Sequence, residues 1–177
     1  MKTNMIKNLA LVFSLFLIST IGFSQEMMDE PLSGVENTKE YKTIDLIYMD
    51  KDMSIFANLL TLSGLDASLE MIDGEHTLFI PTNEAFKDMS IEKFAELTNP
   101  KNRSMLIEFV NRHFTGMKID SSQLTESKIL DMDGKNMIEI SEAGNTVYVG
   151  GATVVASDIE TANGVVHVIN DVINVSK

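Results

Sequence analysis

Three histidines, His76, His113 and His167, are the side chains of this sequence that titrate closest to neutral pH. A zinc site would need them to converge with a carboxylate, and no two of them stand three or four residues apart, as paired ligands on one helix do. His113 and His167 each fall on the apolar side of a predicted element, so we expect both to be buried and held by backbone carbonyl groups. His76 begins a predicted strand, where we expect it to be exposed.

The 26 aspartate and glutamate residues are scattered over polar faces, and no pair stands out for glycoside hydrolysis. The run Asp131–Asn136 superficially suggests a calcium loop, but it lacks the third oxygen ligand before Gly134, so we predict a turn. No nucleophile elbow, phosphate loop or dinucleotide fingerprint occurs. The absence of cysteine excludes disulfides, thiolate metal sites and cysteine nucleophiles. We therefore predict that the protein is not an enzyme and needs no metal or cofactor.

The length of 177 residues is enough for one domain with its own core, and 44% hydrophobic and 23% charged residues are typical of a globular protein. The formal net charge is −12, and it becomes −14 without the first 24 residues, because two lysines and no acid leave with them. Because a surface this acidic repels nucleic acid and anionic membranes, we expect neither as a partner. We interpret the charge mainly as a means of staying soluble.

Residues 1–24 have the three parts of a secretory signal peptide. Two lysines precede an apolar run, and Gly22 and Ser24 are the small residues expected just before a cleavage point. The alternative is a membrane anchor, which needs about 20 apolar residues, and this run is on the short side. We predict cleavage, with no transmembrane span afterwards, a flexible leader over residues 25–41 and a folded domain over residues 42–177.

The stretch Thr77–Ile80 is the element around which the rest of the chain is organised. Its residues are β-branched or apolar without a polar interruption, which predicts a strand with both faces buried. Pro81 ends it, because proline has no N–H to donate to a sheet. Thr82 or Asn83 can then cap a helix whose apolar side begins near Phe86.

Helical spacing of apolar residues predicts short helices before this strand, and two more that begin at Ser90 and at Asn99–Pro100. The last of these carries Met105 on its predicted buried face. After this helix the spacing of apolar residues changes from a period of 3.6 residues to a period of 2, which predicts an antiparallel meander of strands. Its strands are expected at Met137–Ile140, Thr146–Val149, Thr153–Ala156 and Val165–Val168. Helices in the first half and strands in the second predict an α+β domain.

Two stretches of this sequence resemble the signatures of the fasciclin domain family, and the resemblance covers residues 42–175. Thr77–Phe86 is similar to the first signature and Asn163–Ile173 to the second. The residues that carry the match are Thr77, Phe79, Pro81, Thr82, Asn83, Phe86, Asn163, Gly164 and His167. The resemblance implies a fasciclin-like fold, a wedge-shaped β-sandwich of about seven strands with a packed helical layer.

The resemblance also implies candidate binding residues. Asp158 and Ile159 stand where the family has a pair associated with integrin-type receptor binding. We favour the structural interpretation, in which Ile159 lies in the core and Asp158 caps a turn. His113 stands near the family's tyrosine–histidine attachment motif. Arg112 stands where the family usually has tyrosine, so the aromatic ring of that motif is missing here.

We therefore expect a secreted, periplasmic or cell-surface protein that mediates adhesion through a protein or glycan partner at the cell surface or matrix. A lone domain has one binding face, so attachment would need an oligomer or an anchored partner. The alternative is a carrier for a small apolar ligand in the cleft between sheet and helices. A hydrolase is the least favoured alternative, since it rests only on family outliers and on the acid content.

Overall fold

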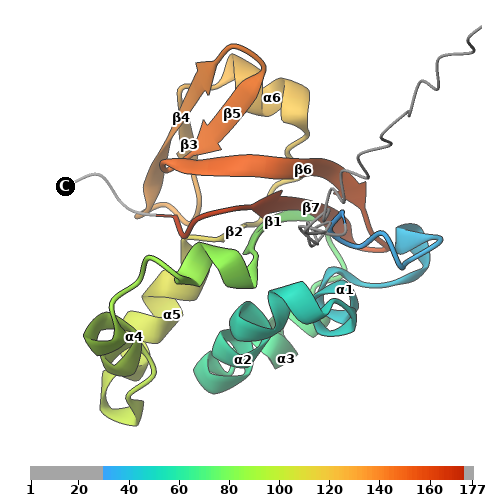
Figure 1. The fold of residues 1–177 in the computed structure, drawn as a ribbon. Helices are drawn as coiled ribbons and strands as arrows, with labels where there is room; N and C mark the ends of the chain where they lie inside the picture. The colour runs from blue at the N-terminus through green and yellow to red at the C-terminus, as the bar shows by residue number, and fades with distance from the viewer. Residues whose placement is uncertain (1–29, 174–177) are drawn as a thin grey trace, which may run out of the picture.

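The computed structural model describes residues 30–173, and within them a helical layer packs against a curled sheet (Figure 1). The α-helices are α1 (Thr43–Met49), α2 (Ser54–Ser63), α3 (Asp66–Glu70), α4 (Ile91–Leu97), α5 (Arg103–Asn111) and α6 (Ser121–Glu126). Single 3₁₀ turns lie at η1 (Thr38–Glu40), η2 (Lys51–Met53), η3 (Asn83–Phe86) and η4 (Pro100–Asn102). The strands are β1 (His76–Pro81), β2 (Phe114–Thr115), β3 (Ile129–Asp131), β4 (Met137–Ala143), β5 (Thr146–Val149), β6 (Ala152–Glu160) and β7 (Gly164–Ile169). The predicted α+β class, the seven strands and the packed helical layer are confirmed.

The strands form one mixed sheet in the order β2-β1-β7-β6-β5-β4-β3. The only parallel pair among them is β1 with β7, which runs in register from His76 opposite Gly164 to Pro81 opposite Ile169. Every residue of both strands is buried, as the uninterrupted apolar run predicts. The two signature stretches therefore lie side by side at the centre of the fold.

Irregular pairing in β6 curls the sheet into two halves. The register between β6 and β7 shifts between Val154 and Ala156 and again between Ala156 and Ile159, and such bulges bend a strand and increase its twist. In Figure 1, strands β3–β5 and helix α6 lie on one side of β6 and β7, and helices α1–α5 lie on the other.

Two hydrophobic cores result from this curl. The first, which includes Phe56 and Leu78, lies between the helices and the β1–β7 pair. The second, which includes Phe79 and Leu124, lies inside the curled sheet and is covered by α6. Successive residues of β1 thus serve different cores, because strand side chains alternate between faces.

The turn after β1 differs from the prediction. Pro81 does end the strand, but Asn83–Phe86 forms only one 3₁₀ turn, and neither Thr82 nor Asn83 caps it with a side chain. Asn83 instead caps α2: its Oδ1 accepts the N–H of Ile55 at 2.9 Å, and its Nδ2 donates to the carbonyl of Lys51 at 2.9 Å. The corner therefore fixes the helical layer through a side chain distant in sequence.

The start of the domain also differs from the prediction. We expected a flexible leader up to residue 41, yet Leu32 is buried and its N–H donates to the Asp50 carboxylate at 2.9 Å. The Thr38 hydroxyl donates to the Glu160 carbonyl at 2.6 Å. The domain thus begins before residue 42. The predicted signal peptide and residues 25–29 lie outside the described residues, and within 30–173 no helix has the length and hydropathy to cross a bilayer.

Smaller elements were partly predicted. Ser90 caps α4 by accepting the N–H of Lys93 at 3.2 Å, and Asn99 caps the turn before α5 by accepting that of Lys101 at 3.0 Å, both as expected. Met105 is 44% exposed, contrary to its expected place in the core. Helix α6 and the short strands β2 and β3 were not predicted.

Candidate binding site

His167 is buried in the second core and uses both ring nitrogens. Its Nδ1 accepts the N–H of Asp158 at 3.3 Å, and its Nε2 donates to the carbonyl of Ile119 at 2.8 Å. The ring stacks on Phe79, with centroids 5.3 Å apart. Burial lowers the pKa of His167, and the Ile119 carbonyl and the carboxylates of Asp158 and Asp120 oppose that shift. Because Nδ1 accepts a hydrogen bond while Nε2 donates one, the imidazole is neutral in this arrangement, and it joins β7, β6 and the segment before α6.

His113 has the same arrangement in the first core. Its Nδ1 donates to the carbonyl of Phe109 at 2.8 Å, and its Nε2 accepts the N–H of Ile173 at 3.2 Å. Burial lowers the pKa of His113 to about 4, although the Phe109 hydrogen bond raises it. The predicted burial of both histidines is confirmed. His113 is fully enclosed, so it contributes to a binding surface only by positioning Phe109 and Ile173.

The expectation for His76 was wrong, because this residue is only 1% exposed. Its Nδ1 donates to the carbonyl of Gly74 at 3.2 Å, its ring lies 5.5 Å from that of Phe114, and its Nε2 has no hydrogen-bond partner in the described structure. Burial lowers its pKa. Gly164 makes the close approach possible, since a Cβ there would lie 2.5 Å from the His76 carbonyl oxygen.

Other signature residues hold segments together at this junction. Asn163 accepts the N–H of Thr43 at 2.9 Å and donates to the Ile72 carbonyl at 3.0 Å. The Thr77 hydroxyl donates to the carbonyl of Met117 at 2.8 Å and accepts the N–H of Ile119 at 2.8 Å. In this structure, their side chains connect parts of the fold.

Asp158 and Ile159 form an exposed corner at the bulge of β6. Asp158 has a left-handed backbone conformation, with φ of 58°, which is uncommon for a residue other than glycine. Its carboxylate accepts the N–H of Ser121 at 2.7 Å and also the Ser121 hydroxyl, so it ties β6 to the start of α6. Ile159 is half-buried against the first core. The corner thus presents a carboxylate in a fixed position.

A hollow of about 440 Å³ adjoins this corner, and its other wall is the segment before α1. Glu160 pairs with Lys39 and lies 3.7 Å from the Nζ of Lys118, which in turn lies 3.5 Å from Glu75. The hollow is lined by Pro31, Leu32, Thr38, Lys39, Asp158, Ile159 and Glu160. Acidic and basic side chains both border the hollow, so its surface is polar.

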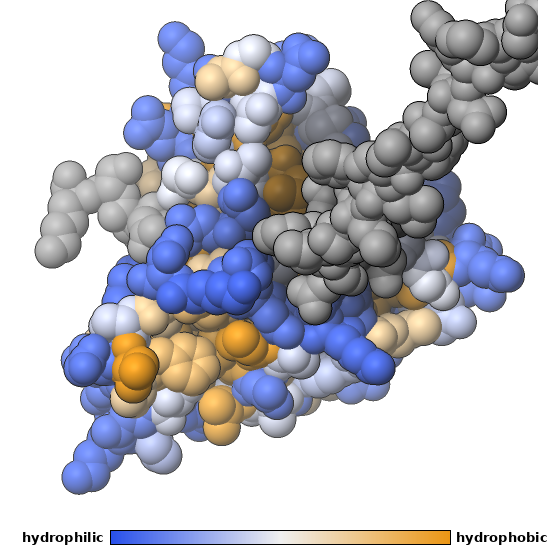
Figure 2. Space-filling view, in the orientation of Figure 1, coloured by the Kyte–Doolittle hydropathy of each residue, from blue (hydrophilic) through white to orange (hydrophobic). Residues whose placement is uncertain are grey.

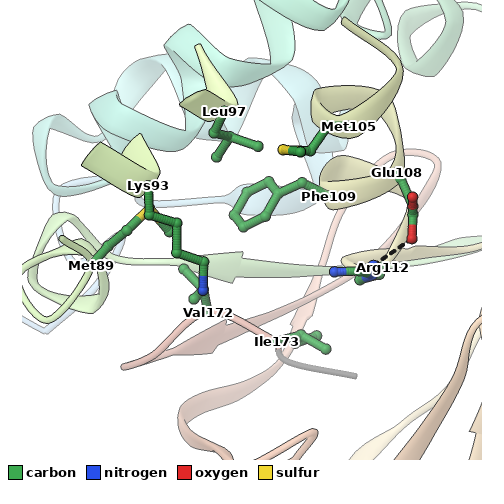
Figure 3. Close-up of a pocket in the computed structure, with 9 residues that line it drawn as sticks. All are labelled: Met89, Lys93, Leu97, Met105, Glu108, Phe109, Arg112, Val172 and Ile173. Atoms are coloured by element: carbon green, nitrogen blue, oxygen red, sulfur yellow. Dashed lines mark hydrogen bonds and ion pairs between the residues drawn. The ribbon is translucent and has the colours of Figure 1, made fainter. Parts of the chain in front are cut away.

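A second concavity, of about 300 Å³, is a groove between α4, α5 and the segment after β7 (Figure 3). None of its lining residues belongs to a strand, whereas we expected a ligand cleft between helices and sheet. The ring of Phe109 lies at its centre in Figure 3. In Figure 2 hydrophobic residues gather over the helical half, while the sheet half is mostly hydrophilic. The lining residues are Met89, Lys93, Leu97, Met105, Glu108, Phe109, Arg112, Val172 and Ile173.

Three charged side chains border this groove. Glu108 pairs with Nη2 of Arg112, four residues along the same helix face. The Nε of Arg112 is buried and has no hydrogen-bond partner in the described structure, and Lys93 has no ion pair within residues 30–173. The sequence shows Arg112 only as a replacement for tyrosine, and it does not reveal the groove, because the lining comes from segments far apart in the chain. Among residues 30–173, no group of three histidine, aspartate or glutamate side chains could hold a metal ion.

Comparisons with known proteins agree on one family. A family model described as the fasciclin domain matches residues 51–175. A similar curated protein, "Protein sll1483" of Synechocystis sp., is 28% identical over 163 residues, which cover 86% of this chain and 90% of that protein. Human periostin is 35% identical over 123 residues, which cover 68% of this chain and 14% of periostin.

Two further matches bear on the fold and on binding. A protein named "Heme ligase" from Plasmodium falciparum is 28% identical over 151 residues, covering 72% of this chain and 73% of that protein. A solved FAS1 domain pair from the insect cell adhesion molecule fasciclin I superposes with a TM-score of 0.58 at 18% identity. It covers 77% of this chain and 51% of the pair. At that identity the structural match shows the shared fold.

Proposed function

Because the chain belongs to the fasciclin domain family, we propose that it is a secreted domain that acts by binding, without catalysis. Its partner is a protein or glycan at the cell surface or in the extracellular matrix. The structural neighbour is described as a cell adhesion molecule, which supports this role.

The exposed corner at Asp158 is the observation that carries the proposal. Its carboxylate is held by the backbone and hydroxyl of Ser121, and its own N–H is held by His167. A group already fixed in position loses little conformational freedom when a partner binds it. The neighbouring hollow and the half-buried Ile159 give such a partner a shaped surface beside the charge.

A cell-attachment assay tests this role. The purified protein would be coated on a surface, and attached cells of the producing strain and of a matrix-binding animal line would be counted against an inert acidic protein. We expect increased attachment, reduced by Asp158→Asn, which keeps an acceptor for Ser121 and tolerates the left-handed backbone but removes the charge. Glu142→Gln, at an exposed acid on β4, is the matched control and should have no effect. Attachment equal to that on the inert protein would contradict the proposal.

The proposal includes export from the cytoplasm and removal of residues 1–24. Fractionation of producing cells, followed by N-terminal sequencing of the exported protein, tests both points. We expect the mature chain to begin at Gln25. A protein that stays in the cytoplasm with Met1 intact would contradict this part of the proposal.

A second candidate function, carriage of a small apolar ligand, is favoured by the groove centred on Phe109. Its volume of about 300 Å³ lies at the lower end of the range of roughly 300–1,000 Å³ that small-molecule sites occupy. The name of the Plasmodium relative, heme ligase, also supports ligand binding in the family. Mass spectrometry of protein purified without detergent should detect a co-purified apolar molecule, and its absence would count against this function.

A further inference from the structure

We propose that the groove between α4, α5 and Val172–Ile173 binds a small amphipathic carboxylate, an acid with an apolar tail. The tail lies on Phe109, and the carboxylate lies between Lys93 and Arg112. This inference rests on the second candidate function above and specifies the chemical class of its ligand.

The apolar part of the groove suits a flexible hydrocarbon tail. Phe109 and Leu97 are buried core residues whose edges form its floor, and Met89 and Met105 flank them. Methionine side chains adapt their shape to irregular apolar partners. Met105 is 44% exposed, so a bound tail would remove apolar surface from water, which favours binding.

The charges of the groove select an anion. The chain has 26 acidic residues and 14 lysines and arginines, so two cations at one apolar groove stand out against the surface as a whole. Glu108 is the one acid in the lining, and it is already paired with Nη2 of Arg112. Lys93, without an ion pair in the described structure, comes from α4, and Arg112 comes from the end of α5 (Figure 3). A carboxylate between them has charge-assisted donors on two sides.

The free Nε of Arg112 gives a specific reason for an acceptor to bind there. A buried N–H without a partner destabilises the structure, and Nε of Arg112 is such a group. Because Nε is covered in the unliganded groove, the guanidinium turns as the carboxylate arrives. Nε then donates to one carboxylate oxygen, while Nη2 keeps its ion pair with Glu108.

Calorimetric titration with three ligands of matched tail tests the charge selection. Decanoate, decanol and decylamine share a tail and differ in the head group. We expect decanoate to bind at least tenfold more tightly than decanol, since a hydrogen bond to a charged group contributes about 1.5–3 kcal/mol. We expect decylamine to bind more weakly than decanol, because Lys93 and Arg112 repel it.

Variants locate the site. Lys93→Gln and Arg112→Gln should each weaken decanoate binding about tenfold and leave decanol unchanged, whereas Lys101→Gln, at an exposed lysine outside the groove, should change neither. Met105→Trp should block both ligands by filling the groove, and thermal unfolding would confirm that each variant folds.

The outcomes separate the two ligand proposals. Equal binding of decanoate and decanol would overturn the carboxylate inference and leave the apolar carrier function standing. A failure of all three ligands to bind would overturn both. Decanoate binding that Met105→Trp and the cation variants leave unchanged would place the ligand elsewhere and would also overturn the inference.

Discussion

His113 and His167 are two buried histidines whose rings make the same kind of hydrogen bonds at two places in the fold. Each ring accepts one backbone N–H and donates to one backbone carbonyl, so each must stay neutral to make both bonds. Protonation would turn the accepting nitrogen into a donor facing another donor. The two histidines therefore couple the central packing of the domain to pH.

The first prediction is a loss of stability in weak acid. The folded-state pKa values of both histidines are lowered, so the unfolded chain takes up protons first as pH falls, and stability rises with pH across this window. The contribution of His113 should be complete above its ordinary pKa of 6.5 and lost as pH approaches about 4. This amounts to roughly 3 kcal/mol.

Urea unfolding at several pH values between 6.5 and 5, above the ordinary range of the carboxylates, measures this slope. A His113→Gln variant should start less stable and show a shallower slope. Equal free energy of unfolding at pH 6.5 and 5 in the wild-type protein would show that these histidines do not control acid sensitivity.

The second prediction concerns Phe79, which is fully buried and stacks on His167. Phe79→Ala should lower the free energy of unfolding by about 3–5 kcal/mol, because a cavity adds to the loss of burial. Phe94→Ala, at a partly buried ring on α4, is the control and should have a smaller effect. Chemical denaturation measures both. A loss at Phe79 no larger than that at Phe94 would contradict the central place of β1.

At the scale of elements, the end of α2 depends on one glycine and one arginine. Gly64 has φ of 75°, and Arg103 donates from Nε and Nη2 to the carbonyl of Ser63 at 3.2 and 2.9 Å. A Cβ at position 64 would lie 2.6 Å from that Nη2. The left-handed backbone and the arginine contact both require glycine there.

The third prediction follows from this contact. Gly64→Ala should lower the free energy of unfolding by about 1–2 kcal/mol from the backbone alone, and by more because Arg103 must move. Gly74→Ala is the matched control, since a Cβ at Gly74 meets no atom within 4 Å. Thermal denaturation would compare the two. A Gly64→Ala protein as stable as wild type would show that α2 does not need this cap.

The central strands were predictable from the sequence because burial on both faces leaves an unbroken apolar run, as in β1. Strand β2 was missed because two residues are too few to show a period. The cap that Asn83 provides to α2 was assigned to the wrong helix, since local spacing does not reveal a partner 28 residues away. The groove escaped prediction for the same reason: Lys93, Arg112 and Val172 meet only after α4, α5 and β7 have packed.

At the scale of the whole molecule, the segment before α1 is part of the domain. Leu32 is buried in the first core, and Thr38 and Lys39 bind Glu160 on β6. Because this segment forms one wall of the hollow beside Asp158, the proposed adhesion surface depends on it.

The fourth prediction tests this dependence. Leu32→Ala should lower the free energy of unfolding by about 2–5 kcal/mol, as expected for loss of a buried leucine. Leu62→Ala, at a leucine of α2 that is 55% exposed, is the control and should change it little. Denaturant unfolding measures both. Equal effects would mean that residues near 32 contribute no more than surface side chains.

The parallel pairing of β1 with β7 has a consequence for biosynthesis. As the chain leaves the ribosome, β1 emerges well before β7, the neighbour that pairs with it from His76 to Pro81. Until β7 has been made, this inner strand has an open edge, and such edges invite pairing with other chains. The synthesis of β7 therefore closes the edge at which nascent molecules could pair with one another.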